Sequence, residues 1–257
     1  MKQTIESFIE IEAPPQVVWP IPVWKHCLDL AFVALTMVAW LPVMCLIALG
    51  IKLTSRGPLF FCQERIGYKN KPFTCLKFRT MKADADTQVH SDHMNDLMSR
   101  DVPMIKMDVA GDPRLIRFGS ILRSTGLDEL PQFINVLRRE MSLVGPRPCT
   151  PSEYRLYSDW QKERFNTLPG LTGLWQVNGK NRTTFREMMN LDIRYARTKT
   201  LWTDLVIIFK TLPAICAQVQ DTQSAQKALS PTPNNLIKYP RPEERRRAAL
   251  FQKPANL

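Results

Sequence analysis

The chain has 257 residues, enough to bury one sizeable core, and we expect one domain. Its formal net charge of +11 favours polyanionic partners, which include phosphorylated substrates, anionic lipid headgroups and nucleic acid. The six cysteines have no Cys-x-x-Cys spacing and no histidine at zinc-finger distance, which excludes a zinc finger and argues against a disulfide framework. We therefore expect the bulk of the chain to lie in a reducing compartment.

The first predicted element is an apolar segment from Leu30 to Ile51, which contains no charged residue. At about 1.5 Å per residue, a helix of this length covers a hydrocarbon core of about 30 Å. A cleavable signal peptide fits poorly, because Glu6, Glu10 and Glu12 precede the segment and no small-residue cleavage site follows it. We expect the segment to enter the bilayer and to remain in the mature protein.

Pro42 lies near the middle of this segment, where it removes a backbone donor and clashes with the carbonyl four residues earlier. We therefore expect a kink near residues 39–41. Proline is tolerated in membrane helices, so Pro42 by itself favours a kinked spanning helix over a segment that turns back. The basic residues after the segment place the C-terminal bulk of the chain in the cytoplasm, whereas Lys25 leaves the side of the N-terminus open.

A small antiparallel hairpin is predicted next, from β-prone runs at Leu59–Cys62 and Phe73–Phe78 with turn-forming residues between them. The stretch 82–111 is polar and lacks a sustained apolar period, so we expect a loop there. Its two histidines, His90 and His93, have no carboxylate partners at a fixed spacing, and we assign them no metal.

Helical patterning returns in an i, i+3, i+4, i+7 stripe that predicts a helix beginning near Asp128 with one buried face. The stripe consists of Leu130, Phe133, Ile134 and Leu137. Two adjacent carboxylates, Asp128 and Glu129, open this helix, where the macrodipole and free backbone N–H groups stabilise anions. Taken alone, the pair is typical of an N-cap aspartate followed by a first-turn glutamate.

Basic residues surround this carboxylate pair in the sequence. Several of them stand in turns constrained by glycine and proline: Arg114, Arg117 and Arg123 upstream, Arg147 in MSLVGPRP downstream, and Lys77 and Arg79 in LKFRTM. Each basic residue taken singly is more often a solvated surface charge. Arginines beside a carboxylate pair can hold diphosphate oxygens in a bidentate way, so together they favour a phosphate site.

A further amphipathic stretch, Leu201–Ala217, places apolar side chains along one side: Trp202, Leu205, Ile208, Phe209 and Leu212. This pattern fits a core-facing helix and an interfacial membrane helix equally well. Residues 218–257 are rich in glutamine, proline and arginine, and they predict a flexible basic tail whose arginines contact lipid headgroups.

Several motifs in fixed order closely resemble the bacterial sugar transferase family, the monotopic polyprenyl-phosphate phosphoglycosyl transferases. They are SRGPLFFCQERIGYKNKPFTCLKFRTM, DPRLIRFGSILR, GLDELPQFINVLRREMSLVGPRP, PGLTGLWQVNGK and LDIRYA. The resemblance covers residues 25–212. Several long motifs in a fixed order are very improbable by chance.

The resemblance implies an α+β fold. It would be a mostly helical single catalytic domain with a small β-hairpin, a re-entrant N-terminal membrane helix that turns at Pro42, and interfacial amphipathic helices. The expected division is an N-terminal extension over 1–24, the re-entrant helix over 25–52, the catalytic domain over 53–217 and the tail over 218–257.

The resemblance also implies a two-step reaction. Asp128 would attack the sugar-linked phosphorus of a UDP-sugar and expel UMP, and polyprenyl phosphate, usually undecaprenyl phosphate, would then take the phosphosugar. Glu129 together with Asp128 would hold Mg²⁺, which neutralises charge on the diphosphate. The remaining residues implied at the phosphate and substrate site are Lys77, Arg79, Arg123, Arg147 and Gln176. Inner-membrane phospholipid would be a further partner, with the catalytic domain on the cytoplasmic face.

Three positions depart from the family pattern. Gly126 stands where the family usually has serine. This change is expected to alter how the chain enters the helix at the dyad more than it alters the catalytic chemistry. Lys25 is followed by His26 in place of the usual arginine, which weakens an expected lipid-headgroup contact. Lys180 replaces a frequent arginine, so a bidentate contact is not expected there.

Two other functions fit part of the pattern. A non-enzymatic membrane-tethered protein that binds anionic lipid or nucleic acid would explain the charge but not the ordered motifs. We expect no nucleic-acid partner, because no helix-turn-helix, zinc finger or RNA-binding aromatic motif is present. The other possibility is a membrane-anchored enzyme that hydrolyses nucleotide sugars and uses no lipid acceptor. The sequence does not identify the sugar or the glycan pathway, and it leaves open whether the protein forms a homo-oligomer.

Overall fold

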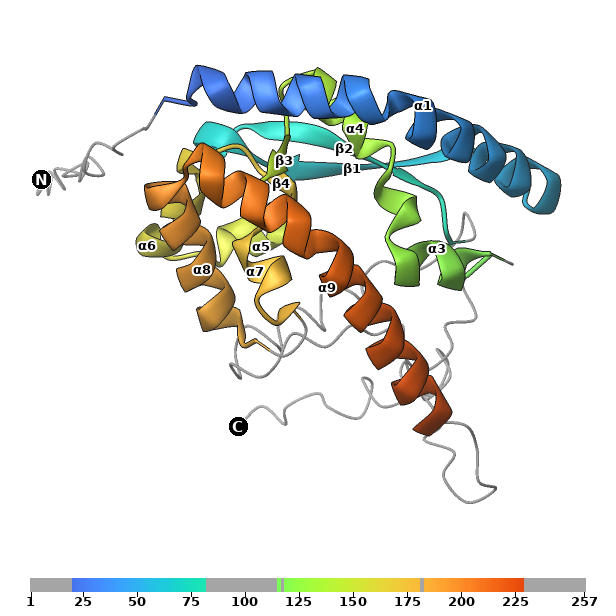
Figure 1. Ribbon diagram of the computed structural model, residues 1–257. Helices are drawn as coiled ribbons and strands as arrows, with labels where there is room; N and C mark the ends of the chain where they lie inside the picture. The colour runs from blue at the N-terminus through green and yellow to red at the C-terminus, as the bar shows by residue number, and fades with distance from the viewer. Residues whose placement is uncertain (1–19, 82–114, 117, 181–182, 229–257) are drawn as a thin grey trace, which may run out of the picture.

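The computed structural model of the protein describes residues 20–81, 115–116, 118–180 and 183–228. The predictions for the loop histidines, for Arg114 and Arg117, and for the chain beyond 228 lie outside these ranges. The described chain contains one long N-terminal helix, a hairpin, a group of short helices around a second strand pair, and two longer helices (Figure 1). The expected α+β, mostly helical fold with a small hairpin is confirmed.

The apolar segment lies within one continuous helix, α1 (Val23–Thr54), with Pro42 inside it. Figure 1 shows the second half of α1 sloping away from the first half, so the helix bends without breaking. Among the described residues, α1 is the one helix long and apolar enough to cross a membrane, by length and composition alone. Large apolar side chains are exposed along it: Leu35, Val38, Leu46, Leu49 and Leu53.

The other side of α1 packs against the rest of the protein along its whole length. Lys25 and Val33 are buried in the first half, and Met44 and Ile51 are buried in the second half. Ile51 belongs to a core cluster that includes Phe78 of the hairpin. Both ends of α1 are therefore fixed to the same domain.

The hairpin forms as predicted. Strand β1 (Phe60–Ile66) pairs antiparallel with β2 (Pro72–Phe78), and a single 3-10 turn, η1 (Tyr68–Asn70), connects them. Strand β1 is longer than expected, because its pairing with β2 continues beyond Cys62 to Ile66.

The predicted helix near Asp128 is shorter and begins later than expected. Helix α3 (Gly119–Thr125) is followed by a 3-10 turn, η3 (Leu127–Glu129), and only then by α4 (Gln132–Leu137). Asp128 therefore lies on the 3-10 turn and is not the N-cap of an α-helix.

The buried face of α4 also differs from the predicted apolar stripe. Gln132, Asn135 and Val136 are buried, whereas Leu137 is 49% exposed. The stripe is correct only in part. Leu130 and Phe133 are partly buried against core clusters, but α4 also directs two amide side chains inward, where Asn135 bonds to neighbouring elements. Phe133 packs against Trp40 of α1, with ring centroids 5.2 Å apart.

The second strand pair is parallel. Strand β3 (Ser142–Val144) pairs with β4 (Gly170–Thr172), and the chain between them forms short helices. These and the next helix along the chain are α5 (Pro151–Arg155), α6 (Asp159–Lys162), η4 (Glu163–Asn166) and α7 (Leu174–Val177). One core cluster joins this region to α8 (Phe185–Thr198) through Phe165, Trp175 and Met189.

The last described helix is α9 (Leu201–Ala228), which continues past residue 217 and so overlaps the first residues of the predicted tail. Asp204 and Ile207 are buried, and they are the buried residues among the α9 side chains that the structure describes. Trp202 and Phe209 of the predicted apolar side are 74% and 77% exposed. The structure therefore does not support a core-facing role for these two side chains, and it leaves an apolar surface on α9.

Candidate active site

The carboxylate dyad is placed by a glycine that ends helix α3. Gly126 has φ +76°, a left-handed conformation that glycine adopts without the steric cost borne by other residues. The chain then turns directly into η3, which carries Asp128 and Glu129. The glycine that departs from the family pattern is therefore the residue type that this backbone favours.

Lys77 on β2 lies beside the dyad. Its Nζ is 2.5 Å from Glu129 Oε1, and both side chains are partly exposed. Exposure limits the stability that such a pair contributes. The contact nevertheless shows that the hairpin places Lys77 at the dyad. Arg123 lies in the last turn of α3, the helix that leads into η3.

Asn135 fixes α4, and with it the dyad, to the hairpin. Its Nδ2 donates to the Thr74 carbonyl at 2.7 Å and to Glu140 Oε2 at 2.6 Å, and its Oδ1 accepts from the Leu76 amide at 3.1 Å. The side chain is fully buried. Sequence reasoning missed this residue, although a polar residue within an apolar helical pattern is the kind of signal that could have identified it.

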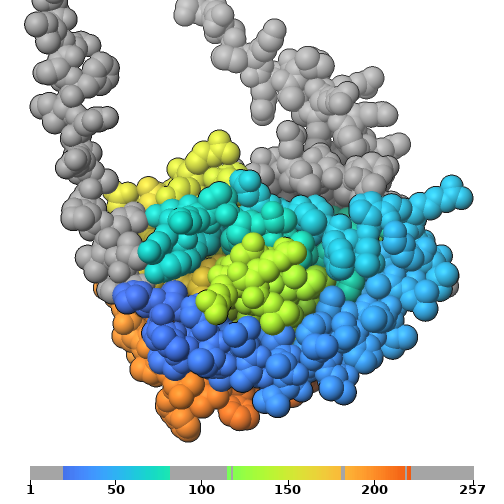
Figure 2. Space-filling view, turned by 90° about the horizontal axis from the view of Figure 1, so that it is seen from above, coloured from blue at the N-terminus to red at the C-terminus, as the bar shows by residue number. Residues whose placement is uncertain are grey.

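Figure 2 shows these elements on one face of the molecule, with α4 between α1 and the β1–β2 hairpin. Trp40 of α1 contacts Phe133 of α4, while Asn135 of α4 contacts β2. The elements that position the dyad are therefore packed directly against the apolar helix.

Arg147 stands on a loop that follows β3. The loop begins at Gly145, whose amide donates to the Thr172 carbonyl at 2.8 Å. A Cβ at this position would lie 2.2 Å from the Leu168 carbonyl oxygen, so only glycine fits. The MSLVGPRP and PGLTGLWQVNGK motifs are thus in backbone contact, which explains why both contain constrained turns.

Two buried arginines hold the carbonyl groups of this loop. Arg164 Nη2 donates to the Arg147 carbonyl at 2.7 Å, and Arg65 Nη1 donates to the Pro148 carbonyl at 3.1 Å. Arg164 also pairs with Asp192 at 2.5 Å, and both side chains are almost fully buried. Burial raises the pKa of Asp192 to about 6, against the lowering effect of Arg164. The LDIRYA motif therefore supplies a structural ion pair beneath the loop of Arg147.

Arg79, which is predicted at the phosphate site, lies at the turn between α1 and β1. Its guanidinium is buried and donates to the Arg56 carbonyl at 2.6 Å and to the Ser55 carbonyl at 3.1 Å. These contacts close the turn between α1 and β1 at Gly57, where an added Cβ would lie 2.5 Å from Arg79 Nη1. Arg79 thus clamps this turn. It lies just beyond the end of β2 at Phe78, whereas Lys77 lies within the strand beside Glu129.

Gln176 lies on α7, where its Nε2 donates to the Leu171 carbonyl at 3.0 Å. Its buried Oε1 has no hydrogen-bond partner within the described part of the chain. The same motif continues to Asn178 and Gly179, which line an open pocket of about 870 Å³ between α7, α8 and α9. Lys210 and Arg194 supply positive charge to this pocket.

Lys25, the basic residue before the apolar segment, points into the protein. Its side chain is 0% exposed, and its Nζ lies 2.6 Å from Asp204 Oδ2 on α9. Because the ammonium is enclosed by the protein, it cannot reach a headgroup. Lys25 therefore forms a buried ion pair within the domain.

The dyad offers two carboxylates to a metal ion. No group of three or more histidine, cysteine, aspartate or glutamate side chains close enough to hold a metal occurs in the described ranges. Mg²⁺ commonly uses one or two carboxylates and completes its shell with water and substrate phosphate oxygens. Asp128 and Glu129, adjacent on one 3-10 turn, fit this pattern of oxygen donors.

Comparison with known proteins gives consistent results. Among relatives, the exopolysaccharide production protein ExoY of Sinorhizobium fredii is 36% identical over 192 residues, which cover 75% of this chain and 85% of the relative. The UDP-glucose:undecaprenyl-phosphate glucose-1-phosphate transferase of Caulobacter vibrioides is 40% identical over 199 residues, covering 74% and 69%.

The undecaprenyl-phosphate galactose phosphotransferase of Salmonella typhimurium is 35% identical over 192 residues, covering 74% of this chain and 40% of that protein. The family model described as bacterial sugar transferase matches residues 21–218, which include every element that positions the dyad. The chain is an enzyme and belongs to the bacterial sugar transferase family.

Proposed function

We propose that this protein transfers a sugar 1-phosphate from a UDP-sugar to a polyprenyl phosphate, with undecaprenyl phosphate as the expected carrier. The observation that carries the proposal is the Asp128–Glu129 dyad, which faces Lys77 on elements packed against the apolar helix α1. The relatives named as undecaprenyl-phosphate sugar phosphate transferases support the same reaction class.

The first step is nucleophilic. A carboxylate oxygen of Asp128 attacks the sugar-linked phosphorus, an aspartyl–phosphorus bond forms, and the bond between that phosphorus and UMP breaks. UMP leaves with the electron pair of the broken bond. Lys77 lies beside the dyad and is placed to stabilise negative charge on the donor diphosphate.

The second step returns the enzyme to its starting state. A phosphate oxygen of the polyprenyl phosphate attacks the same phosphorus, and the bond to Asp128 breaks, which gives a polyprenyl diphosphate sugar. Dividing the transfer into two steps means that the site does not have to hold the water-soluble donor and the lipid acceptor together. Bound Mg²⁺ would neutralise charge on the diphosphate as UMP leaves.

The remaining basic residues have separate parts in this proposal. Arg147 binds donor phosphate through its planar guanidinium, held in place by the contacts to its loop. Arg123 is assigned to the same phosphate region because it stands on the helix that leads into the dyad. Arg79 stays a predicted member of the phosphate region; its Nη1 and Nη2 groups donate to the turn after α1, and its buried Nε has no partner among the described residues.

We also propose that α1 enters and leaves one leaflet of the bacterial inner membrane, with the catalytic domain on the cytoplasmic face. Lys25 and Ile51, near the two ends of α1, are both buried against the same domain. A helix crossing the bilayer would carry one of these ends to the far side, away from the domain. The packing of Trp40 against Phe133 supports the bend between them.

The experiment is an assay of UMP release from a panel of UDP-sugars, with and without undecaprenyl phosphate. The proposal predicts sustained release only when the lipid phosphate is present, together with a lipid-linked diphosphate sugar product. Sustained release without the lipid would identify a nucleotide-sugar hydrolase. Binding of anionic lipid without any release would support a membrane-tethered binding protein.

A further inference from the structure

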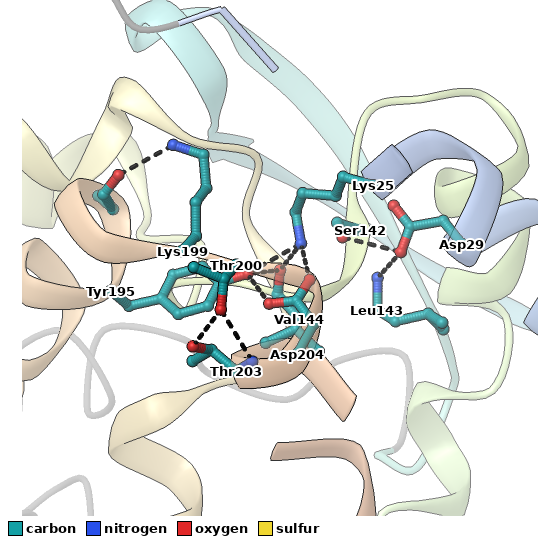
Figure 3. A network of polar contacts seen from close by, with 11 residues as sticks. Lys25, Asp29, Ser142, Leu143, Val144, Tyr195, Lys199, Thr200, Thr203 and Asp204 are labelled. Atoms are coloured by element: carbon teal, nitrogen blue, oxygen red, sulfur yellow. Dashed lines mark hydrogen bonds and ion pairs between the residues drawn. The ribbon is translucent and has the colours of Figure 1, made fainter. Parts of the chain in front are cut away.

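Lys25, in the first turn of α1, uses all three of its ammonium hydrogens inside the protein (Figure 3). Its Nζ donates to the Val144 carbonyl at 2.8 Å, to the Tyr195 hydroxyl at 2.9 Å and to Asp204 Oδ2 at 2.6 Å. The side chains of Lys25 and Asp204 are both fully buried. The charges balance, and the cluster joins α1 to strand β3 and to helices α8 and α9.

The Val144 carbonyl depends chiefly on Lys25 in this cluster. The Tyr195 hydroxyl lies 3.1 Å from that carbonyl, but it also lies 2.6 Å from Asp204 Oδ1. A neutral phenol has one hydrogen, and the shorter contact to the carboxylate takes it. Burial and Asp204 raise the pKa of Tyr195 well above its ordinary value, so the phenol keeps that hydrogen.

Val144 is the residue from which the loop of Arg147 departs. The Pro146 carbonyl of that loop accepts from the Gly170 amide of β4, and the carbonyls of Arg147 and Pro148 further along accept from Arg164 and Arg65. Three buried cations on separate elements therefore hold successive parts of one loop. Lys25 differs from the other two because it stands on the membrane helix.

A second contact of α1 strengthens the same connection. Asp29 Oδ1 accepts from the Ser142 hydroxyl and from the Leu143 amide, each at 2.9 Å. The first turns of α1 thus bind the strand β3 at consecutive residues, directly before Val144. Loss of these contacts would leave polar and charged groups buried without partners, which makes separation of α1 from β3 costly.

We propose that Lys25 is a positioning residue through which the seating of α1 on the domain sets the position of Arg147. The inference rests on the proposed contact between Arg147 and donor phosphate. When α1 is seated, Lys25 holds the start of the loop and the guanidinium is aligned. When α1 is displaced, the Val144 carbonyl loses its donor, Asp204 loses its partner, and the loop opens. Donor binding is thereby linked to the placement of the apolar helix.

The test uses the full chain in lipid nanodiscs and two forms of the Lys25 change. Lys25→Met removes the donor but leaves Asp204 buried and unpaired, which risks unfolding. The double variant Lys25→Met, Asp204→Asn removes both charges and keeps an acceptor for Tyr195. Lys199→Met is the matched control, because Lys199 lies near the same cluster and its Nζ donates to the Ala196 carbonyl.

Two quantities are measured on each folded variant: amide hydrogen exchange of the peptide 142–150, and the KM and kcat for the UDP-sugar. We expect exchange in this peptide to rise about tenfold in the double variant, with the peptides of the β1–β2 hairpin unchanged. The donor KM should rise by about the same factor while kcat changes less. Lys199→Met should leave both quantities at the wild-type level.

Several results would overturn the inference. They are unchanged exchange of the loop in a folded Lys25 variant, an equal rise across the whole domain, an equal effect of Lys199→Met, and an opened loop with an unchanged donor KM. If the wild-type protein transfers no sugar phosphate at all, this result contradicts the proposed function but not the role of Lys25 in holding the loop. The exchange measurement still reports whether Lys25 holds the loop.

Discussion

Glu129 on the turn η3 and Lys77 on strand β2 form an ion pair of 2.5 Å, which joins the carboxylate dyad to the hairpin. The pair is partly exposed, so it contributes little to folding stability. Its value is positional, because it places a cation beside the two groups assigned to phosphoryl transfer. In the proposed reaction, Lys77 would bind the donor diphosphate when Mg²⁺ occupies the carboxylates.

Glu129→Gln tests the metal assignment. The amide keeps the shape of the side chain but weakens the binding of a hard cation, so we expect activity to fall about tenfold or more at limiting Mg²⁺. Raising the Mg²⁺ concentration should restore part of the activity. The measurement is the Mg²⁺ dependence of UMP release, and a curve identical to that of the wild type would remove Glu129 from the metal site.

Arg147→Lys tests whether the guanidinium acts through its planar fork. Lysine supplies the charge but not two parallel donors, so Arg147→Lys should be nearly as damaging as Arg147→Ala. Both should reduce kcat/KM by about 10- to 100-fold, the range expected for lost hydrogen bonds to a charged group. Recovery of most activity by lysine would show that Arg147 acts only as a local charge.

The sequence predicted the dyad, its nearby cation Lys77 and the hairpin, because these depend on local patterns and on motifs of fixed order. It did not predict the roles of Arg79 and Lys25, since each is decided by contacts with carbonyl groups or carboxylates supplied by other parts of the fold. Arg79 and Lys77 look equivalent in LKFRTM, yet only Lys77 faces the dyad. Asn135 was missed for the same reason, because its partners on β2 are far away in sequence.

Gly126 gives a prediction about stability. Its left-handed conformation should make Gly126→Ala destabilising by about 1 kcal/mol, because a Cβ is disfavoured there even though the surrounding space is open. Gly126→Asn should cost less, since asparagine tolerates this conformation better than alanine. Chemical denaturation in detergent measures both. Equal stability of the alanine variant and the wild type would contradict the role given to Gly126.

The topology of α1 can be measured with a single cysteine near residue 10 in a protein from which the six native cysteines have been removed. Because both ends of α1 pack against the same domain, we expect a membrane-impermeant thiol reagent to leave this cysteine unlabelled in intact cells. Labelling after permeabilisation is the control for reactivity. Labelling of intact cells would show that α1 crosses the bilayer.

Pro42→Ala addresses the cause of the bend in the same assay. Restoring the backbone donor should straighten α1 and shift a fraction of the molecules toward outward labelling. The packing of Lys25 and Ile51 opposes this shift, so the fraction should be small. If the labelled fraction does not change, the bend is caused by the packing of α1 on the domain and not by the proline.

The central claim is that Asp128 forms a covalent bond to the phosphosugar, and its most direct test is intact-protein mass spectrometry after incubation with a UDP-sugar and Mg²⁺ in the absence of lipid acceptor. We predict a mass increase equal to one sugar phosphate, located at Asp128 by peptide mapping and discharged by added undecaprenyl phosphate. Asp128→Asn should fold normally, show no adduct and lose activity by more than about 1,000-fold. A folded Asp128→Asn protein that retains full activity, or an adduct on another residue, would contradict the account.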